Sequence, residues 1–252
     1  MKYFVNEGSI VRQIWGKADT ILFIFAGASA EFALNKAVDW LYFTGKLPAD
    51  PLGRLFSTVT YARLIVFSEY DAALKSIDKI TAIHQGVEKQ RGSQIPDWAY
   101  RDVLFMLIDY SIRSFEVLER KLTREEKKEI FATFYEVGFR MGINGLPTDL
   151  DKWETMRREH LQDNLLSSDF TIDLYKQYKK HLGAIRYRML KQVQIMVVPQ
   201  RVKDLLSLGE RSMLTPALHA YKLSRFFGIE KPFRNALLPV DYKAKVLELD
   251  LV

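Results

Sequence analysis

One histidine stands on the apolar face of an expected helix and is the side chain best suited to chemistry. His84 follows Ile77 and Ile80 and precedes Val87, at spacings of three, four and three, so these side chains share one helical face. An imidazole in such a place is most often a core residue satisfied by one hydrogen bond. The alternative is a neutral imidazole that binds a metal while its other ring nitrogen is hydrogen-bonded. Spacing alone leaves both interpretations open.

Arg54 and Thr58 lie one helical turn apart in the preceding segment, on the same side of an expected helix. The structural interpretation has the arginine extending past core residues and the threonine hydrogen-bonding to a carbonyl of its own helix. The functional interpretation gives Arg54 an anionic partner in a pocket and makes Thr58 a nearby hydrogen-bond donor. The sequence supports the two interpretations equally.

Glu31 is the only charged residue between Asp19 and Lys36. A carboxylate in apolar surroundings either pairs with a cation or has its pKa raised, and in the second case it could act as a general base. The helix could also turn Glu31 towards solvent or towards Arg54. Asp39 is the other carboxylate close by in the sequence. We treat Glu31 as a candidate catalytic residue.

The helices that must position these residues are marked by caps and by helical periodicity. Asp50 and Pro51 start the helix that carries Arg54 and Thr58, and the helix with His84 starts near Tyr70. Glu31 belongs to an apolar helix that we expect from Asp19 to Leu41. Further starts are expected at Ser9, Asp97, Thr123 with Glu126, Thr148, Ser168, Pro199 and Pro216. No strand pair or repeat is evident, so the prediction is an all-α, single-domain, globin-like bundle of about ten helices over residues 1–252.

Several short motifs together resemble a known superfamily of haem-dependent oxygenases. The run Pro51-Leu-Gly-Arg54-x-x-x-Thr58 is followed by Ala82-Ile-His84-Gln-Gly-Val87. Further similarity lies at Ile95–Tyr100, Thr123–Glu126, Gly142–Pro147 and Leu182–Tyr187. The superfamily contains the latex-clearing (rubber) oxygenases and the fungal MpaB-like oxygenase of mycophenolic acid biosynthesis. The resemblance covers roughly residues 9–208, which leaves 209–252 as a C-terminal extension.

The resemblance implies a haem b-dependent oxidoreductase that uses O₂ on an apolar, small organic substrate. His84 would be the proximal iron ligand, Arg54 and Thr58 would belong to the haem pocket, and Glu31 could be a base. Apolar pocket walls are expected from Phe23, Phe25, Leu104 and Leu107. The chain departs from the family pattern at Asn35-Lys36, where many relatives carry His-Pro, and near Leu107, where relatives carry a further histidine. Neither departure touches the expected axial ligand, but both bear on the substrate class.

The amino-acid composition limits which metal sites the protein can form. The 252 residues contain no cysteine, which excludes disulfides, thiolate nucleophiles, iron–sulfur clusters and thiolate-ligated haem. Histidine is then the leading protein ligand for a haem iron, and the candidates are His84, His160, His181 and His219. No Glu-x-x-His or His-Glu-x-x-His motif occurs, so the ferritin-like di-iron and zincin patterns are absent.

Charge and hydropathy bear on partners and location. The net charge is +6, and residues 174–203 contain eight Lys or Arg but no Asp or Glu. This stretch is either a solvated helix face or a basic surface for peripheral contact with anionic membrane, and we expect no nucleic-acid partner. The apolar stretch 21–34 is too short for a membrane span. Since no signal peptide is expected either, we predict a cytoplasmic protein.

A non-catalytic helical protein is the alternative hypothesis. Such a protein would keep the fold and bind haem or another small ligand, or it would act as an interaction module.

Overall fold

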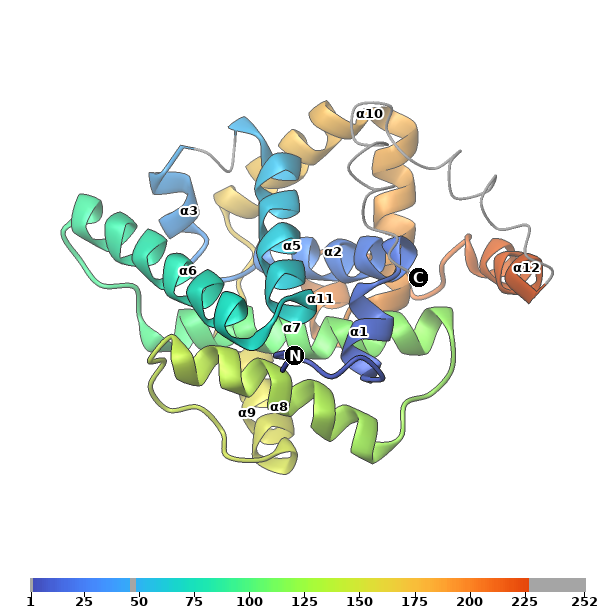
Figure 1. Cartoon of the computed structure of the whole chain (residues 1–252). Helices are drawn as coiled ribbons and strands as arrows, with labels where there is room; N and C mark the ends of the chain where they lie inside the picture. Colours follow the sequence, from blue (N-terminus) through green and yellow to red (C-terminus); the bar gives the residue numbers. More distant parts are fainter. Residues whose placement is uncertain (1, 46–48, 227–252) are drawn as a thin grey trace.

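The computed structural model describes residues 2–45 and 49–226, except for the side chains of residues 51, 52, 54–56 and 223–226. Within these residues the secondary structure is helical apart from two isolated β-bridges, which confirms the all-α, single-domain bundle. The boundary expected after residue 208 stays a prediction. The helices are α1 (Ile10–Trp15), α2 (Ala18–Phe32), α3 (Asp39–Phe43), α5 (Pro51–Phe67), α6 (Tyr70–Arg91), α7 (Asp97–Leu118), α8 (Arg124–Arg140), α9 (Leu150–Asp163), α10 (Asp169–Val197), α11 (Gln200–Leu205) and α12 (Thr215–Phe226), as Figure 1 shows.

Most helix starts follow the caps that the sequence indicates. Ser9 and Asp50 each accept a backbone N–H at the start of their helices, at 3.0 and 2.8 Å. Capping boxes begin α8 at Thr123 and α10 at Ser168. The expected cap at Thr148 is wrong. Asp149 caps α9 instead, because a carboxylate is the stronger acceptor for the N–H groups of a helix N-terminus.

The helix expected from Asp19 to Leu41 is wrong at its C-terminal end. α2 stops at Phe32 and the chain becomes helical again only in α3. Between the two helices, the Asn35 side chain accepts a hydrogen bond from the Ala37 amide at 2.8 Å. An asparagine side chain competes in this way for backbone groups that a continuous helix would use.

α2 and α7 pack against each other across the middle of the molecule, and α1, α8 and α10 surround them (Figure 1). The two central helices approach so closely at Gly27 that a Cβ there would lie 2.2 Å from the Tyr110 ring. Trp15, Phe105 and Tyr110 are fully buried around this contact. α2 is therefore the buried core helix that its apolar sequence indicates. In the described part of the chain, no helix has the length and apolar character needed to cross a membrane.

α10 is a bent helix. Gly183 adopts φ +73° and ψ 170° in its middle, a conformation that is open only to glycine, and α10 turns there at the top of Figure 1. The helical spacing of apolar residues between 174 and 189 predicts one continuous apolar face, and this prediction is wrong beyond the bend. Leu174 and Tyr178 are buried before it, but Ile185 is 77% exposed after it.

Candidate functional site

His84 lies on α6, which packs against α5 through its first half. Ile77 is completely buried there, in a cluster with Ile65 of α5 and Val137 of α8. Two turns later His84 is only half-buried, although its Nδ1 atom is shielded from solvent. Its ring meets the Tyr100 ring edge-on, with centroids 5.2 Å apart. The imidazole thus lies at the margin of the core and not inside it.

Thr58 occupies the middle of α5 and is half-buried. Helical spacing predicts an apolar stripe of Leu55, Val59, Ala62 and Val66 on α5. The last three are buried, and the Leu55 side chain lies outside the described residues. Arg54 belongs to the first turns of α5, but its side chain lies outside the described residues. The structure therefore places Thr58 and His84 on one packed helical pair, and the role of Arg54 rests on the sequence.

Glu31 pairs with a buried cation, which is the first of the two alternatives that its apolar sequence surroundings indicate. Arg157 of α9 holds it through two N–H groups, one to each carboxylate oxygen, both at 2.5 Å. The Tyr110 hydroxyl donates a third hydrogen bond to Glu31 at 2.7 Å. Glu31 is 1% exposed. Its partners come from α7 and α9, whereas Thr58 and His84 belong to α5 and α6. Glu31 is thus held by other helices than the two residues with which it was expected to share a site.

The same arginine also holds Asp109 of α7. The Arg157 Nε and NH2 groups donate to Asp109 Oδ2 at 3.1 and 2.9 Å, and Arg113 donates to Oδ1 at 2.7 Å. Burial alone would raise the pKa of Asp109, but the charges of Arg157 and Arg113 hold this pKa below its usual value. Burial and the Glu31 carboxylate keep the pKa of Tyr110 well above its usual range, so its phenol remains a proton donor. The two arginines therefore let the buried Asp109 stay ionised, and the hydrogen bonds of Arg157 tie α2, α7 and α9 together.

A second buried carboxylate, Asp102 of α7, contacts the segment that follows α2 and the C-terminal end of α9. Asn35 donates to it at 2.8 Å, Asn164 donates at 3.0 Å, and His160 Nδ1 contacts its other oxygen. The His160 ring stacks on Phe105, with centroids 5.0 Å apart. Asn35, which replaces the histidine expected in many relatives, thus holds a buried aspartate in this protein.

The remaining histidines differ from His84 in their surroundings. His181 on α10 and His219 on α12 are exposed, and His160 is engaged by Asp102. Among the residues that the structure describes, no group of three or more acidic or histidine side chains could hold a metal ion. His84 is therefore a half-buried histidine whose ring lies against an aromatic ring, that of Tyr100.

The apolar residues expected to wall a substrate pocket belong to the main core. Phe25 and Leu104 are buried, and Phe23 and Leu107 pack partly buried against the same cluster. Leu104 fills the space beside Gly138 of α8, where an added Cβ would lie 2.6 Å from it. Leu104 thus serves the contact between α7 and α8.

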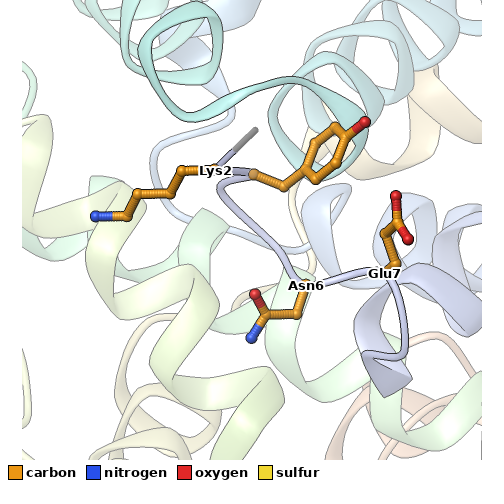
Figure 2. A pocket seen from close by; sticks show the side chains of 4 residues that line it. Lys2, Asn6 and Glu7 are labelled. Carbon is orange, nitrogen blue, oxygen red and sulfur yellow. The ribbon is translucent and has the colours of Figure 1, made fainter.

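An open hollow of about 610 Å³ lies beside the N-terminal segment. Figure 2 shows that Lys2, Asn6 and Glu7 line it and point in different directions. The Lys2 ammonium group lies over the Tyr70 ring, 4.4 Å from its centroid. These side chains do not converge on a common ligand, and none of the residues singled out from the sequence lines this hollow.

Sequence reasoning missed Arg157, Asp109 and the Asp102 cluster. A signal was available for the two aspartates, because each interrupts the apolar pattern of α7 and is nevertheless buried. Arg157 has no such signal, since it stands among the charged residues of a polar helix. Only the packing of α9 on α7 shows that it is buried.

Comparison with protein families gives one match over most of the chain. Residues 14–228 match the model of the ER-bound oxygenase mpaB/B′/rubber oxygenase catalytic domain. Among individual curated proteins, none matches the sequence. The matched range includes α2, α5, α6, α7 and α9, and hence both the α5–α6 pair and the buried charge network. The chain therefore belongs to the mpaB and rubber oxygenase catalytic-domain family.

Proposed function

We propose that this protein is a haem b-dependent oxygenase that uses O₂ on an apolar organic substrate, with His84 as the proximal iron ligand. The observation that carries the proposal is the match of residues 14–228 to an oxygenase catalytic domain. When bound, haem would supply the iron at which O₂ reacts. The residues of the chain would bind the haem, orient its ligand and limit access of water.

The donor chemistry of the described residues fits a haem. The chain would supply a histidine to a haem iron, because it contains no cysteine. A half-buried histidine on a helix suits this role, because it can face a cofactor on one side and the protein on the other. His84 has this environment, whereas His181 and His219 are exposed and His160 is held by Asp102.

Tyr100 would act as a positioning residue for His84. Its ring meets the imidazole edge-on at an angle of 71°. Its hydroxyl donates to Glu88 of α6 at 3.1 Å, and the Ile95 amide donates to the same oxygen at 2.9 Å. Glu88 lies one turn beyond His84, so these bonds fix the tyrosine relative to the helix that carries the imidazole. An imidazole oriented in this way retains a defined ring plane for metal binding.

Thr58 and Arg54 would form the α5 side of the pocket. The Thr58 hydroxyl can donate or accept a hydrogen bond. The Arg54 guanidinium would pair with an anion such as a haem propionate, because its fork of N–H groups matches a carboxylate. We assign no proton transfer to Glu31, since Arg157 and Tyr110 occupy both of its oxygens.

Haem reconstitution tests the proposal. Purified protein incubated with hemin should show a Soret band that shifts on reduction and on addition of CO. His84→Ala should abolish or shift this band while the far-UV circular dichroism stays helical, because the iron–imidazole bond is lost but the fold is not. His181→Ala and His219→Ala, which change exposed histidines, are the matched controls. Protein that takes up no hemin would contradict the proposal, and loss of the band in a control but not in His84→Ala would identify a different ligand.

Peripheral contact with an anionic membrane is a further part of the proposal. Lys176, Lys179 and Lys180 are exposed on α10, close in the chain to the exposed Ile172 and Ile185. Basic and apolar side chains on one helix suit the surface of an acidic bilayer. The cytoplasmic location stays a prediction.

A further inference from the structure

A hollow that the proposed oxygenase chemistry does not use lies beside the bend in α10. This hollow has a volume of about 420 Å³ and is open to solvent. Gly183 divides α10 into a first arm before it and a second arm after it. Three stretches of chain line the hollow: the first arm with the residues that precede the helix, the second arm, and the end of α11 with the loop that follows. All of its lining residues are described, and neither His84 nor Thr58 is among them.

Contacts between the two arms of α10 give the hollow a defined wall. The Tyr175 hydroxyl, from the first arm, donates to Gln194 of the second arm at 3.0 Å. The Tyr175 and Tyr187 rings meet edge-on across the bend, with centroids 6.4 Å apart. Gln194 is fully buried and also donates to Ser29 of α2 at 3.3 Å. The bend is thus anchored to the core helix, and the hollow beside it belongs to the folded protein.

Three lysines line this hollow without a counter-charge. Lys176 and Lys179 come from the first arm of α10 and Lys191 from the second. None of its lining residues is acidic. In the described part of the chain, no ion pair involves any of the three lysines, and Asp173 of the same helix is engaged by Tyr42 at 2.9 Å. Ammonium groups gathered in this way favour an anion that carries more than one negative charge.

The rest of the wall is apolar. Ile172, the Tyr175 and Tyr187 rings and two leucines at the end of α11 supply carbon surface next to the lysines. Ile172 is 54% exposed although it is a large aliphatic residue. A ligand that covered it would remove apolar surface from water while it neutralised the lysines.

We propose that this hollow binds the phosphate group of an amphipathic phosphate ester, with the hydrocarbon part of the ligand on the wall formed by Ile172 and the tyrosine rings. Lysine is a common phosphate ligand because its ammonium group is a compact charge with several N–H donors. The same chemistry is offered by a soluble alkyl phosphate and by the headgroup of an anionic phospholipid. The site is independent of haem, so its test does not depend on the proposed oxygenase activity.

The test compares two variants that lose the same charge from the same region. The hollow variant carries Lys176→Gln, Lys179→Gln and Lys191→Gln. The control variant carries Arg188→Gln, Lys203→Gln and Arg211→Gln, which neither line the hollow nor belong to the exposed lysines proposed for membrane contact. Binding of hexyl phosphate and of inorganic phosphate is measured by calorimetry, and binding to phosphatidylcholine vesicles with and without phosphatidic acid is measured by sedimentation. Equal melting temperatures of the two variants establish that both are folded.

We expect the hollow variant to bind hexyl phosphate at least about tenfold more weakly than the wild type, and the control variant to match the wild type. Inorganic phosphate should bind more weakly than hexyl phosphate, since it lacks the apolar part. If binding to acidic vesicles falls in the same variant, the headgroup of a membrane lipid is the ligand. If only hexyl phosphate distinguishes the variants, the ligand is a soluble ester. Equal losses in both variants, or no binding of hexyl phosphate to the wild type, would overturn the proposal.

Discussion

Replacing Arg157 with methionine should lower the free energy of unfolding by about 3–5 kcal/mol, the usual effect of leaving a buried charge without its partner. Methionine retains much of the side-chain volume but removes the cation that neutralises Glu31 and Asp109. Asp109 keeps Arg113 at 2.7 Å, whereas Glu31 keeps only the Tyr110 hydroxyl. Most of the loss should therefore come from Glu31. A loss of this size is a large part of the roughly 5–15 kcal/mol that stabilises a typical folded domain.

The effect of Arg157→Met should depend on pH. The arginines hold the pKa of Asp109 below its usual value in the folded protein, against the effect of burial. A carboxylate of this kind stabilises the fold above its unfolded pKa, and this contribution is lost as the pH falls through the folded pKa. Removal of Arg157 removes part of that contribution. The difference between wild type and variant should thus be largest near neutral pH and should narrow below about pH 4, near the ordinary pKa of aspartate.

Urea unfolding followed by tryptophan fluorescence is a suitable assay, because Trp15 and Trp153 are buried and report on the core. Adding Glu31→Gln to Arg157→Met should restore part of the lost stability, since the uncompensated charge disappears. Arg124→Met, which removes an exposed ion pair with Asp151, is the control and should unfold like the wild type. Two results would refute this account of the network. One is a loss of unfolding free energy below about 1 kcal/mol for Arg157→Met, and the other is an equal loss near neutral pH and below about pH 4.

Two glycines give further predictions that thermal and urea unfolding can check. Gly27→Ala should lower the free energy of unfolding by about 1–3 kcal/mol, because the added Cβ would lie 2.2 Å from the Tyr110 ring. The control is Gly86→Ala, whose added Cβ would have no atom within 4 Å, so this variant should be as stable as the wild type or more stable. Gly183→Ala should cost about 1–3 kcal/mol through its φ of +73° alone, since no atom lies within 4 Å of the added Cβ. Unchanged stability of Gly27→Ala would mean that α2 and α7 can separate, and unchanged stability of Gly183→Ala would mean that the bend in α10 is optional.

The sequence alone determined most helix starts and much of the family assignment. The caps at Ser9, Asp50, Thr123 and Ser168 could be predicted because a cap and the amide that it binds lie within one helical turn. The motifs around Arg54, Thr58 and His84 led to the same oxygenase family that the match over residues 14–228 shows. The early end of α2 could not be predicted from caps alone. Besides the local bond of Asn35, Lys36 donates its amide there to the carbonyl of Asn164, more than a hundred residues away in the chain.

Tertiary structure decided which charges meet and which faces are covered. The sequence shows that Glu31 is a carboxylate in an apolar helix, but its partner Arg157 is 126 residues away in a polar helix. Likewise, the periodicity of α10 predicts one apolar face, and the bend at Gly183 exposes Ile185 and brings Lys176 and Lys191 to one hollow. Caps and periodicity act over a few residues, whereas the burial of a side chain depends on which helices pack around it. That packing is a property of the whole chain, so no local pattern contains it.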